Sequence, residues 1–466
     1  ENGHISAASN SALQLATGDY IGLLDHDDEL APDALLSIAS AINKNPDVKL
    51  IYSDEDKIDR VGRRREPHFK SDWNPDLLLS HNYIGHLCVF EHDRVKECGA
   101  FREGFEGSQD HDLLLRFTHD LDCNAILHIP QVLYHWRAVA GSTALNETAK
   151  EYTNINGIKA VHTAARRIND SASVDVGLMP NSYRVTFPIP DAPPLVSLLI
   201  PTRDQLSLTR QCITSIVDLT RYHNFEIIIV DNGSVHPETL AYFDEIASDS
   251  IRVLRYNAPF NFSAINNYAV RHARGSILGF VNNDIEVISE DWLTEMVSHA
   301  AREGVGCVGA KLYYSDGSIQ HAGVILGLGG VAGHSHKHFP RDHPGHFGRL
   351  RLVQNLSAVT AACMLVRRSI FEEVGGFNET DLTIAFNDVD FCLRVRALGY
   401  RNVWTPYAEL YHHESASRGH EDTPEKSKRF AAEIQFMKDS WKEELIHDPY
   451  YSPNLTRDRE DFSIAT

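Results

Sequence analysis

Two short apolar stretches decide the fold: Leu195-Val196-Ser197-Leu198-Leu199-Ile200-Pro201-Thr202 and Phe225-Glu226-Ile227-Ile228-Ile229-Val230. Both are rich in β-branched and other apolar residues, which favours buried strands. Residues 205–219 have helical spacing, and the second stretch stops at the turn sequence Asp231-Asn232-Gly233-Ser234. A strand, a helix and a strand joined by short loops predict a parallel βαβ sheet, whose ligands bind at the carboxyl ends of the strands. Thr202 and Asp231 lie at such ends.

The sequence that follows this unit is a second copy of the sequence at the start of the chain. Residues 6–12 resemble residues 263–269, and the same offset aligns residues 18–27 with residues 275–284. Further matches follow in the same order: Glu29 with Glu286, residues 110–116 with 388–394, and Tyr134-His135 with Tyr411-His412. Ordered matches of this kind indicate a tandem duplication of one domain.

The repeat suggests four segments in an α/β protein. We expect a partial first copy over residues 1–145, a helical linker over 146–193, a complete second copy over 194–420 and a helical tail over 421–466. The first copy starts after the strand–helix–strand half, so we expect it to be N-terminally truncated and to lack that half.

Composition narrows the class of partner. Lys and Arg number 44 against 64 Asp and Glu, and the resulting formal charge of -20 argues against a nucleic-acid partner. A nucleotide remains compatible, because a metal held between carboxylates can neutralise its phosphates. The seven cysteines form no C-x-x-C pair, and neither a membrane span nor a signal peptide is evident. We expect a cytoplasmic protein, with peripheral association at the inner face of the plasma membrane left open.

Clustered carboxylates and amides follow an apolar strand in each copy. In the first copy these are Asp25 and Asp27, and in the second they are Asn282, Asn283 and Asp284. Carboxylates packed at a strand end repel each other, and Mg²⁺ or Mn²⁺ would relieve that repulsion and hold a diphosphate. The alternative is that each motif is only a polar turn after a buried strand. Because the motif recurs in matching context in both copies, the metal-binding interpretation is favoured.

A second pair of acidic motifs follows in each copy, at Asp110 and at Asp388. Each precedes a helix of the form Leu-x-x-Arg, so an aspartate here could cap the helix or remove a proton from an acceptor hydroxyl. Both roles can coexist, with Asp390 capping while Asp388 does the chemistry. His135 and His412 come next, and each is a candidate metal ligand beside the upstream carboxylates.

Taken together, these motifs resemble the inverting family 2 glycosyltransferases, above all the two-domain bacterial enzymes of O-antigen, capsule and cell-wall polysaccharide synthesis. The resemblance covers about residues 1–140 and 195–420. It is carried by residues 196–202, 229–234, 280–284, 375–377 with 387–390, and 411–415. It implies tandem GT-A domains, each a Rossmann-like, mainly parallel sheet with flanking helices, the first truncated.

The resemblance also implies roles for individual residues. The nucleotide-binding residues would be Pro201, Thr202, Arg203, Asp231 and Asn283, with Asp231 contacting the uracil or thymine ring. Asp284 and His412 would hold the Mg²⁺ or Mn²⁺, and Asp388 would be the general base of an inverting displacement. In the first copy, Asp25, Asp27 and His135 match the metal ligands and Asp110 matches the base.

Two departures from the family pattern affect the second copy. Asn282 and Asn283 replace the first acidic positions, so the metal would be held by Asp284 and His412 only. Asn387 stands where many relatives have Glu, although Asp388 remains.

The expected partners are a nucleotide-sugar donor and a saccharide or lipid-linked oligosaccharide acceptor. A catalytically silent GT-A scaffold that binds nucleotide or saccharide is one alternative, kept open by Asn282 and Asn283. A nucleotidyltransferase is another, but it should show a Gly-rich basic phosphate loop, which residues 201–204 do not form.

Five histidines cluster in a Gly- and Pro-containing stretch: His334, His336, His338, His343 and His346. Alternate histidines on one strand face could bind zinc. No Cys or fixed ligand spacing accompanies them, so a polar loop beside the acceptor site is the favoured interpretation.

Overall fold

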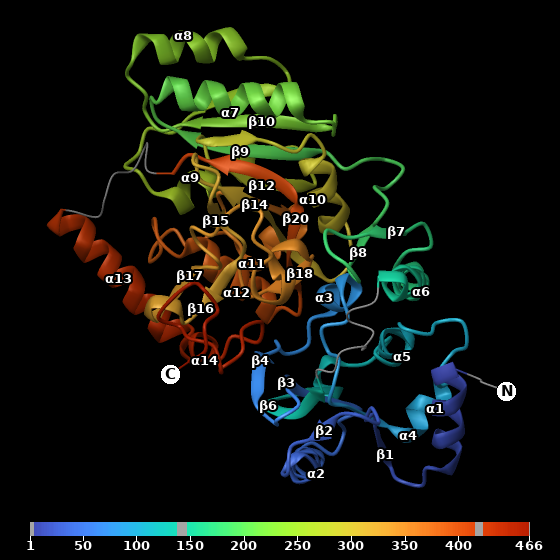
Figure 1. Cartoon of the computed structure of the whole chain (residues 1–466). Coiled ribbons are helices and arrows are strands. Elements are labelled where there is room, and N and C mark those ends of the chain that lie inside the picture. Colours follow the sequence, from blue (N-terminus) through green and yellow to red (C-terminus); the bar gives the residue numbers. More distant parts are fainter. Residues whose placement is uncertain (1–3, 138–146, 415–422, 466) are drawn as a thin grey trace.

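Two β-sheets organise the chain (Figure 1). The structure, a computed structural model, describes residues 4–137, 147–414 and 423–465. The predicted segment boundaries at 145/146 and 420/421 lie outside these residues, as does Ser415 of the last family motif. The larger sheet occupies the second copy and the smaller sheet the first.

The larger sheet begins with the predicted βαβ unit. Strands β9 (Val196–Thr202) and β10 (Phe225–Asp231) are parallel and joined by helix α7 (Leu206–Leu219). Parallel strands β11 (Ile251–Arg255) and β12 (Ile277–Val281) flank them, in the order β11-β10-β9-β12. Thr202 pairs with Asp231, so both predicted strand ends lie at the same edge of the sheet.

The second half of this sheet is mixed. From β12 the order continues through β19 (Cys363–Arg367), β14 (Val305–Tyr313), β20 (Arg401–His412) and β13 (Ile285–Val287). Only β14 and β20 pair in parallel here. Two short strands, β15 (Ile319–His321) and β18 (Gln354–Leu356), add to β14 and β20. The α/β class is confirmed, with parallel pairing concentrated in the β11-to-β12 half.

The smaller sheet repeats this second half. Its order is β1 (Tyr20–Gly22), β5 (Cys88–Glu91), β3 (Leu50–Ile58), β6 (Ile126–Arg137) and β2 (Glu29–Leu30), with β4 (Arg64–His68) paired to β3. Only β3 and β6 pair in parallel, as β14 and β20 do. The matching order and direction support the duplication. The described part of the first copy has no counterpart of β9, β10 and β11.

Helices cover both faces of the larger sheet, each through an apolar core. One face packs against α7, α8 (Pro237–Ile246) and α10 (Trp292–Ala300). The other packs against α9 (Phe262–His272), α11 (Arg368–Val374) and α12 (Asn387–Ala397). In the first copy, α2 (Ala34–Lys44) covers one face, while α3 (Pro75–Ser80), α4 (His92–Glu97) and α5 (Gln109–Phe117) contribute to the other core. Helix α1 (His4–Leu15) precedes the first strand.

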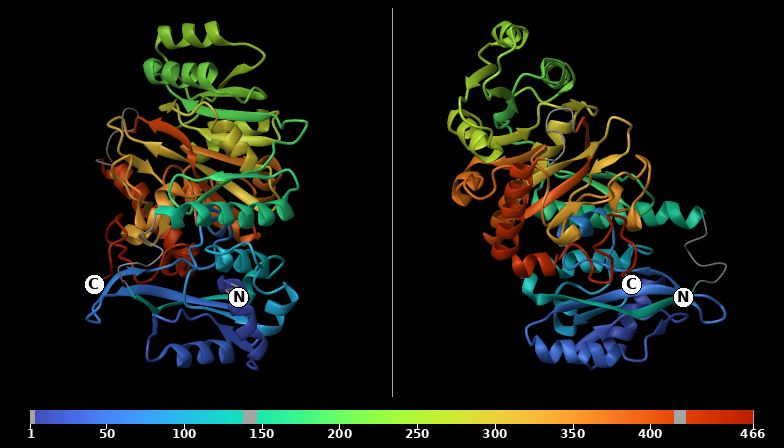
Figure 2. Two further views of the ribbon diagram at one scale, coloured as in Figure 1. Left: turned by 45° about the vertical axis from the view of Figure 1, so that its right-hand side comes forward. Right: turned by 90° about the vertical axis from the view of Figure 1, so that its left-hand side faces the viewer.

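The linker and the tail contain more than helices. Helix α6 (Glu147–Ile168) is followed by a hairpin of β7 (Ser173–Val176) and β8 (Tyr183–Thr186), which the sequence pattern did not predict. Helices α13 (Pro424–Ser440) and α14 (Lys442–Ile446) lead into a non-helical segment that reaches the first copy (Figure 2). There Asn454 Nδ2 donates to Asp54 Oδ2 at 3.1 Å.

A buried polar contact joins the two copies. Asp76, at the start of α3, is 2% exposed, forms an ion pair with Arg302 Nη1 at 2.7 Å and accepts a hydrogen bond from Arg401 Nε at 3.0 Å. Asn355 Nδ2 also donates to Asp76 Oδ2 at 2.7 Å, and Asn74 exchanges hydrogen bonds with the Asn355 backbone.

Among the described helices, none combines the length and apolarity that crossing a bilayer requires.

Candidate functional site

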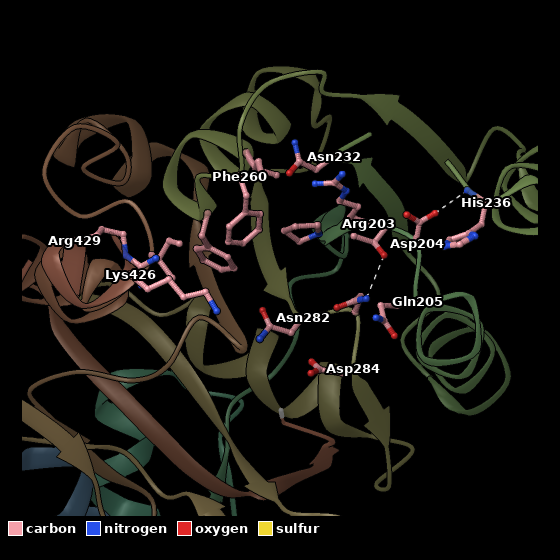
Figure 3. A pocket seen from close by; sticks show the side chains of 16 residues that line it. Arg203, Asp204, Gln205, Asn232, His236, Phe260, Asn282, Asp284, Lys426 and Arg429 are labelled. Atoms are coloured by element: carbon pink, nitrogen blue, oxygen red, sulfur yellow. Dashed lines mark hydrogen bonds between the residues drawn. The ribbon is translucent and has the colours of Figure 1, made fainter. Parts of the chain in front are cut away.

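A cavity of about 490 Å³ opens at the carboxyl ends of β9 and β10 (Figure 3). Four of the five predicted nucleotide-binding residues line it: Pro201, Thr202, Arg203 and Asn283. Asn283 Nδ2 donates to the hydroxyls of Thr202 at 3.2 Å and Thr209 at 3.3 Å, which fixes the amide against the end of β9. The parallel half of the sheet thus forms a pocket where the fold predicts one.

Asp231, the fifth predicted residue, is fully buried and does not line this cavity. Its carboxylate accepts from the backbone N–H of Ser234 at 2.7 Å and forms an ion pair with Arg255. The Asp231 side chain therefore holds the turn after β10 in place through its hydrogen bond with Ser234.

Other residues of the same cavity were missed by sequence reasoning. Asp204 accepts from the backbone N–H groups of Val235 at 3.0 Å and His236 at 2.9 Å, which ties the loops after β9 and β10 together. Figure 3 shows Lys426 and Arg429 of α13 on the opposite side of the cavity from Asp204 and His236. Lys426 and Arg429 lie more than 200 residues along the chain from Thr202 and belong to no recognisable sequence motif. Their presence in the cavity could therefore not be predicted from the sequence.

Asp284, which lines this cavity, lies beside His412. Asp284 Oδ1 lies 3.3 Å from His412 Nε2, and the Asn282 amide lies 3.2 Å from the same nitrogen. The contact arises because Ile285 of β13 pairs with His412 of β20. The structure therefore brings together the two residues predicted to bind the metal. Within the described ranges, no three His, Cys, Asp or Glu side chains form a ready-made metal site.

A second cavity of about 470 Å³ contains Asp388. It shares three lining residues with the first cavity, Phe262, Asn282 and Ile384, so the two cavities adjoin, and together they are called the cleft below. Asp388, at the start of α12, accepts from the backbone N–H of Ala361 at 3.0 Å and of Val389 at 2.9 Å. Each carboxylate oxygen can still accept another hydrogen bond.

Asp390 does not cap α12 as predicted. Its buried carboxylate accepts from Arg394 Nε at 2.8 Å and from Trp441 Nε1 at 3.0 Å. Asp390 therefore attaches α12 to the tail, and Asp388 is the aspartate of this motif that lines the cavity.

The first copy brings together only part of its predicted set. Asp25 Oδ2 lies 3.9 Å from His86 Nε2. Burial raises the pKa of Asp110, the nearby His86 lowers it and Asp25 raises it, which places these three groups in one cluster. Asp27 is half-exposed beside His26 instead.

His135 is not part of that cluster. Its Nδ1 lies 2.5 Å from Asp56 Oδ1, on a side chain that also pairs with Arg64. Glu29 pairs with His135, whereas its repeat partner Glu286 pairs with Tyr411. This one-residue shift of register turns His135 to the opposite face of the sheet from the one that His412 occupies. The predicted metal set of Asp25, Asp27 and His135 is therefore not assembled.

The five clustered histidines do not converge on one site, although His336 and His346 both stack on Phe462. His336 stacks on Phe462 and His338 on Tyr314, with ring centroids 4.3 and 4.8 Å apart. Only His334 among the five lines the cleft, in the cavity of Asp388. The zinc alternative has no assembled ligand set in the described residues.

Comparison with known proteins identifies the family. The model of the Glycosyl transferase family 2 domain matches residues 1–99 and 197–375, one stretch in each copy and more than half of the chain together. The chain belongs to glycosyl transferase family 2. The membership predicted from the motifs is confirmed, and the double match agrees with the repeated strand order.

Two relatives of this family 2 chain are longer proteins. It is 56% identical to the uncharacterized protein y4gI of Sinorhizobium fredii, over 100% of this chain and 51% of that protein. It is 38% identical to the O-antigen biosynthesis protein RfbC of Myxococcus xanthus, over 99% of this chain and 36% of that protein. The chain thus spans about half and about a third of their lengths.

A mannosyltransferase of Pyrobaculum calidifontis, solved with GDP-Man and Mn²⁺, matches 66% of this chain and 77% of its own, with 17% identity and a TM-score of 0.41.

Proposed function

We propose that the second copy transfers a sugar from a nucleotide-sugar donor to an acceptor hydroxyl, with inversion and with the help of a divalent cation, in the synthesis of a cell-surface polysaccharide. The observation that carries this proposal is the pair of adjoining cavities. It places the pocket at the strand ends on one side, Asp388 on the other, and the Asp284–His412 pair near the junction. The relationship to an O-antigen biosynthesis protein supports the polysaccharide context.

The donor nucleoside would occupy the cavity at the ends of β9 and β10. Thr202, Arg203 and Asn283 line it with hydroxyl, guanidinium and amide groups that can bind a nucleoside diphosphate. Asp231 would act by holding the turn after β10 in place through Ser234, in contrast to the base contact that the resemblance implies.

The Asp284–His412 pair fits a divalent cation. Neighbouring ligand atoms in an octahedral Mg²⁺ site lie about 3 Å apart, close to the 3.3 Å between Asp284 Oδ1 and His412 Nε2. One or two protein ligands are enough when substrate phosphates complete the shell. Bound there, Mg²⁺ or Mn²⁺ would stabilise the negative charge on the departing diphosphate.

Asp388 would serve as the general base. The acceptor oxygen forms a bond to the anomeric carbon from the face opposite the diphosphate, while its proton passes to the Asp388 carboxylate. The bond from the anomeric carbon to the phosphate oxygen breaks, and the nucleoside diphosphate leaves with the electron pair. Attack from the opposite face inverts the anomeric centre. The backbone amides of Ala361 and Val389 hold the carboxylate in position for this step.

The test uses Mn²⁺ and a panel of UDP-, dTDP- and GDP-sugars. Calorimetry measures nucleotide binding, and donor consumption is compared between wild type and Asp388→Asn. The proposal expects the variant to bind the nucleotide as wild type does and to lose transfer by about 10²- to 10⁴-fold. Absence of nucleotide binding and of donor consumption in wild type would refute the enzyme assignment. Binding without any turnover would favour the silent scaffold.

A further inference from the structure

The cavity beside Asp388 has one aromatic wall and one polar wall. Phe386 and Phe430 stack on each other, with ring centroids 5.7 Å apart and an interplanar angle of 20°. The polar lining includes His334, Gln320 and Glu414. Aromatic faces beside neutral hydrogen-bonding groups suit a molecule with both apolar C–H faces and hydroxyl edges.

A buried histidine fixes the tautomer of His334. The backbone N–H of Thr360 donates to His321 Nε2 at 3.3 Å, and His321 is fully buried. A neutral imidazole carries one N–H, so that of His321 is on Nδ1. His321 Nδ1 lies 3.0 Å from His334 Nδ1 and donates to it. His334 Nδ1 is therefore an acceptor, and the proton of His334 is on Nε2.

Burial keeps both rings neutral. It lowers the pKa of His321, and the neighbouring His334 and His412 lower it further. Burial also lowers the pKa of His334, although Asp388 and Glu414 oppose the shift, while Lys337 and His412 add to it. The structure gives His334 Nε2 no hydrogen-bond partner among the described residues. A neutral N–H donor is therefore left for a molecule in the cavity.

Gln320 lines the same cavity and has an acceptor oxygen that is not used within the described residues. Its side chain is 3% exposed, and its Nε2 donates to Glu414 Oε2 at 3.2 Å. Its Oε1 is buried without a hydrogen-bond partner in the part of the chain that the structure describes. A buried amide oxygen without a partner costs free energy, which a bound donor would recover.

We propose that His334 and Gln320 bind hydroxyl groups of an acceptor saccharide, with His334 donating from Nε2 and Gln320 accepting at Oε1. The sugar ring lies along Phe386, so that its reacting hydroxyl faces Asp388. This inference rests on the proposed glycosyl transfer and specifies the acceptor: a neutral sugar ring is recognised next to the base. His321 is a positioning residue, because it acts only by fixing the tautomer of His334.

The test compares variants on p-nitrophenyl glycosides as acceptors, with the monodeoxy analogue of each accepted glycoside. His334→Phe removes the hydrogen-bond donor, and His334→Gln keeps an N–H group. His321→Phe removes the hydrogen bond that fixes the tautomer of His334. His338→Phe is the matched control, since His338 belongs to the same stretch but stacks on Tyr314 outside the cleft. Nucleotide affinity and donor hydrolysis without acceptor are measured on every variant.

The inference expects His334→Phe and His321→Phe to raise the acceptor KM about tenfold, with nucleotide affinity and donor hydrolysis unchanged. His334→Gln should recover most of the loss, and His338→Phe should match wild type. One monodeoxy glycoside should be a poorer acceptor than its parent for wild type but not for His334→Phe. That coupling identifies the hydroxyl that His334 binds.

Failure of the inference is distinct from failure of the proposed function. If wild type hydrolyses donor but no glycoside competes with water, or if His334→Phe leaves the acceptor KM unchanged, the acceptor inference is overturned. Equal losses of nucleotide affinity and acceptor affinity in His334→Phe would also overturn it, because they indicate a structural role. If wild type neither binds nucleotide nor consumes donor, the proposed function itself fails.

Discussion

Asp284, Asn282 and His412, which we propose hold the cation, contain a single carboxylate among them. One carboxylate and one imidazole face each other, and an amide occupies the position where the first copy has Asp25. Metal affinity of such oxygen-rich sites rises with the number of charged ligands. We therefore expect the cation to bind weakly until the donor diphosphate adds its own oxygens.

Substitutions at Asn282 and at His412 should change the Mn²⁺ affinity in opposite directions. Asn282→Asp adds a carboxylate beside Asp284 and should tighten Mn²⁺ binding by about tenfold, whereas His412→Ala should weaken it by about tenfold or more. Mn²⁺ titration followed by electron paramagnetic resonance measures both. His413→Ala is the control, since His413 pairs with Glu286 at 2.8 Å, and it should leave the affinity unchanged. A shift in the same direction for both variants would contradict the assignment of the pair.

For individual site residues, the sequence predicted the contacts of the second copy better than those of the first. The repeat and the family resemblance predicted that His412 and Asp284 bind the same metal, and the pairing of β13 with β20 brings the two side chains together. The same logic failed for His135, because strand register depends on cross-strand packing, and a shift of one residue is invisible in a motif alignment. The roles of His321 and Gln320 were missed because neither belongs to a repeated motif.

Helix α13 is the element that closes the cleft on the side away from α7. Its Glu433 is 1% exposed and accepts from the hydroxyl of Thr383 at 3.0 Å and the backbone N–H of Ile384 at 2.8 Å. Ile384 belongs to both cavities, so this contact links the helix to the shared wall of the cleft.

Removing that contact should release α13 locally. Glu433→Ala removes the acceptor of the Thr383 hydroxyl, the Ile384 N–H and the Arg429 guanidinium, and should cost about 1–3 kcal/mol of local stability. Hydrogen exchange should then accelerate in α13 while β9 and β10 remain protected, and the donor KM should rise. Glu425→Ala, on an exposed position of the same helix, is the control. Unchanged exchange in α13 would show that Glu433 does not hold the helix.

Elements with strong local patterns were predictable. The expected strands at 195–202 and 225–230 and the helix at 205–219 correspond to β9, β10 and α7, because apolar periodicity decides them. The hairpin β7–β8 and the attachment of the tail were not predicted, because short strands and non-helical segments are fixed by contacts distant in sequence. Asn454, for example, contacts Asp54.

For the whole molecule, Asp76 is the residue on which the joining of the copies depends most. Burial alone would raise its pKa, but Arg302 and Arg401 hold the pKa of this carboxyl well below its usual range. Since an unfolded aspartate titrates near pH 4, Asp76 stabilises the folded chain above about pH 4. That contribution is lost as the pH falls from there towards the lower folded pKa.

Asp76→Asn should therefore destabilise the protein by about 3–5 kcal/mol near neutral pH, because it leaves Arg302 buried without its charge partner. The variant should also lose less stability than wild type as the pH falls below about 4. Urea unfolding across a pH series measures both effects. Asp93→Asn, at a side chain that is 85% exposed, is the control and should change little. Parallel pH profiles for wild type and Asp76→Asn would contradict this account.

We propose that the second copy, with its complete strand set, contains the active cleft of this chain. Asp388 and Asp110 occupy matching positions in the two copies, so each is the natural control for the other. The most direct measurement is the initial rate of sugar transfer for Asp388→Asn and Asp110→Asn under identical Mn²⁺ and donor conditions. The account predicts a loss of at least about a hundredfold for Asp388→Asn and a rate close to wild type for Asp110→Asn. A full rate in Asp388→Asn together with a lost rate in Asp110→Asn would contradict it.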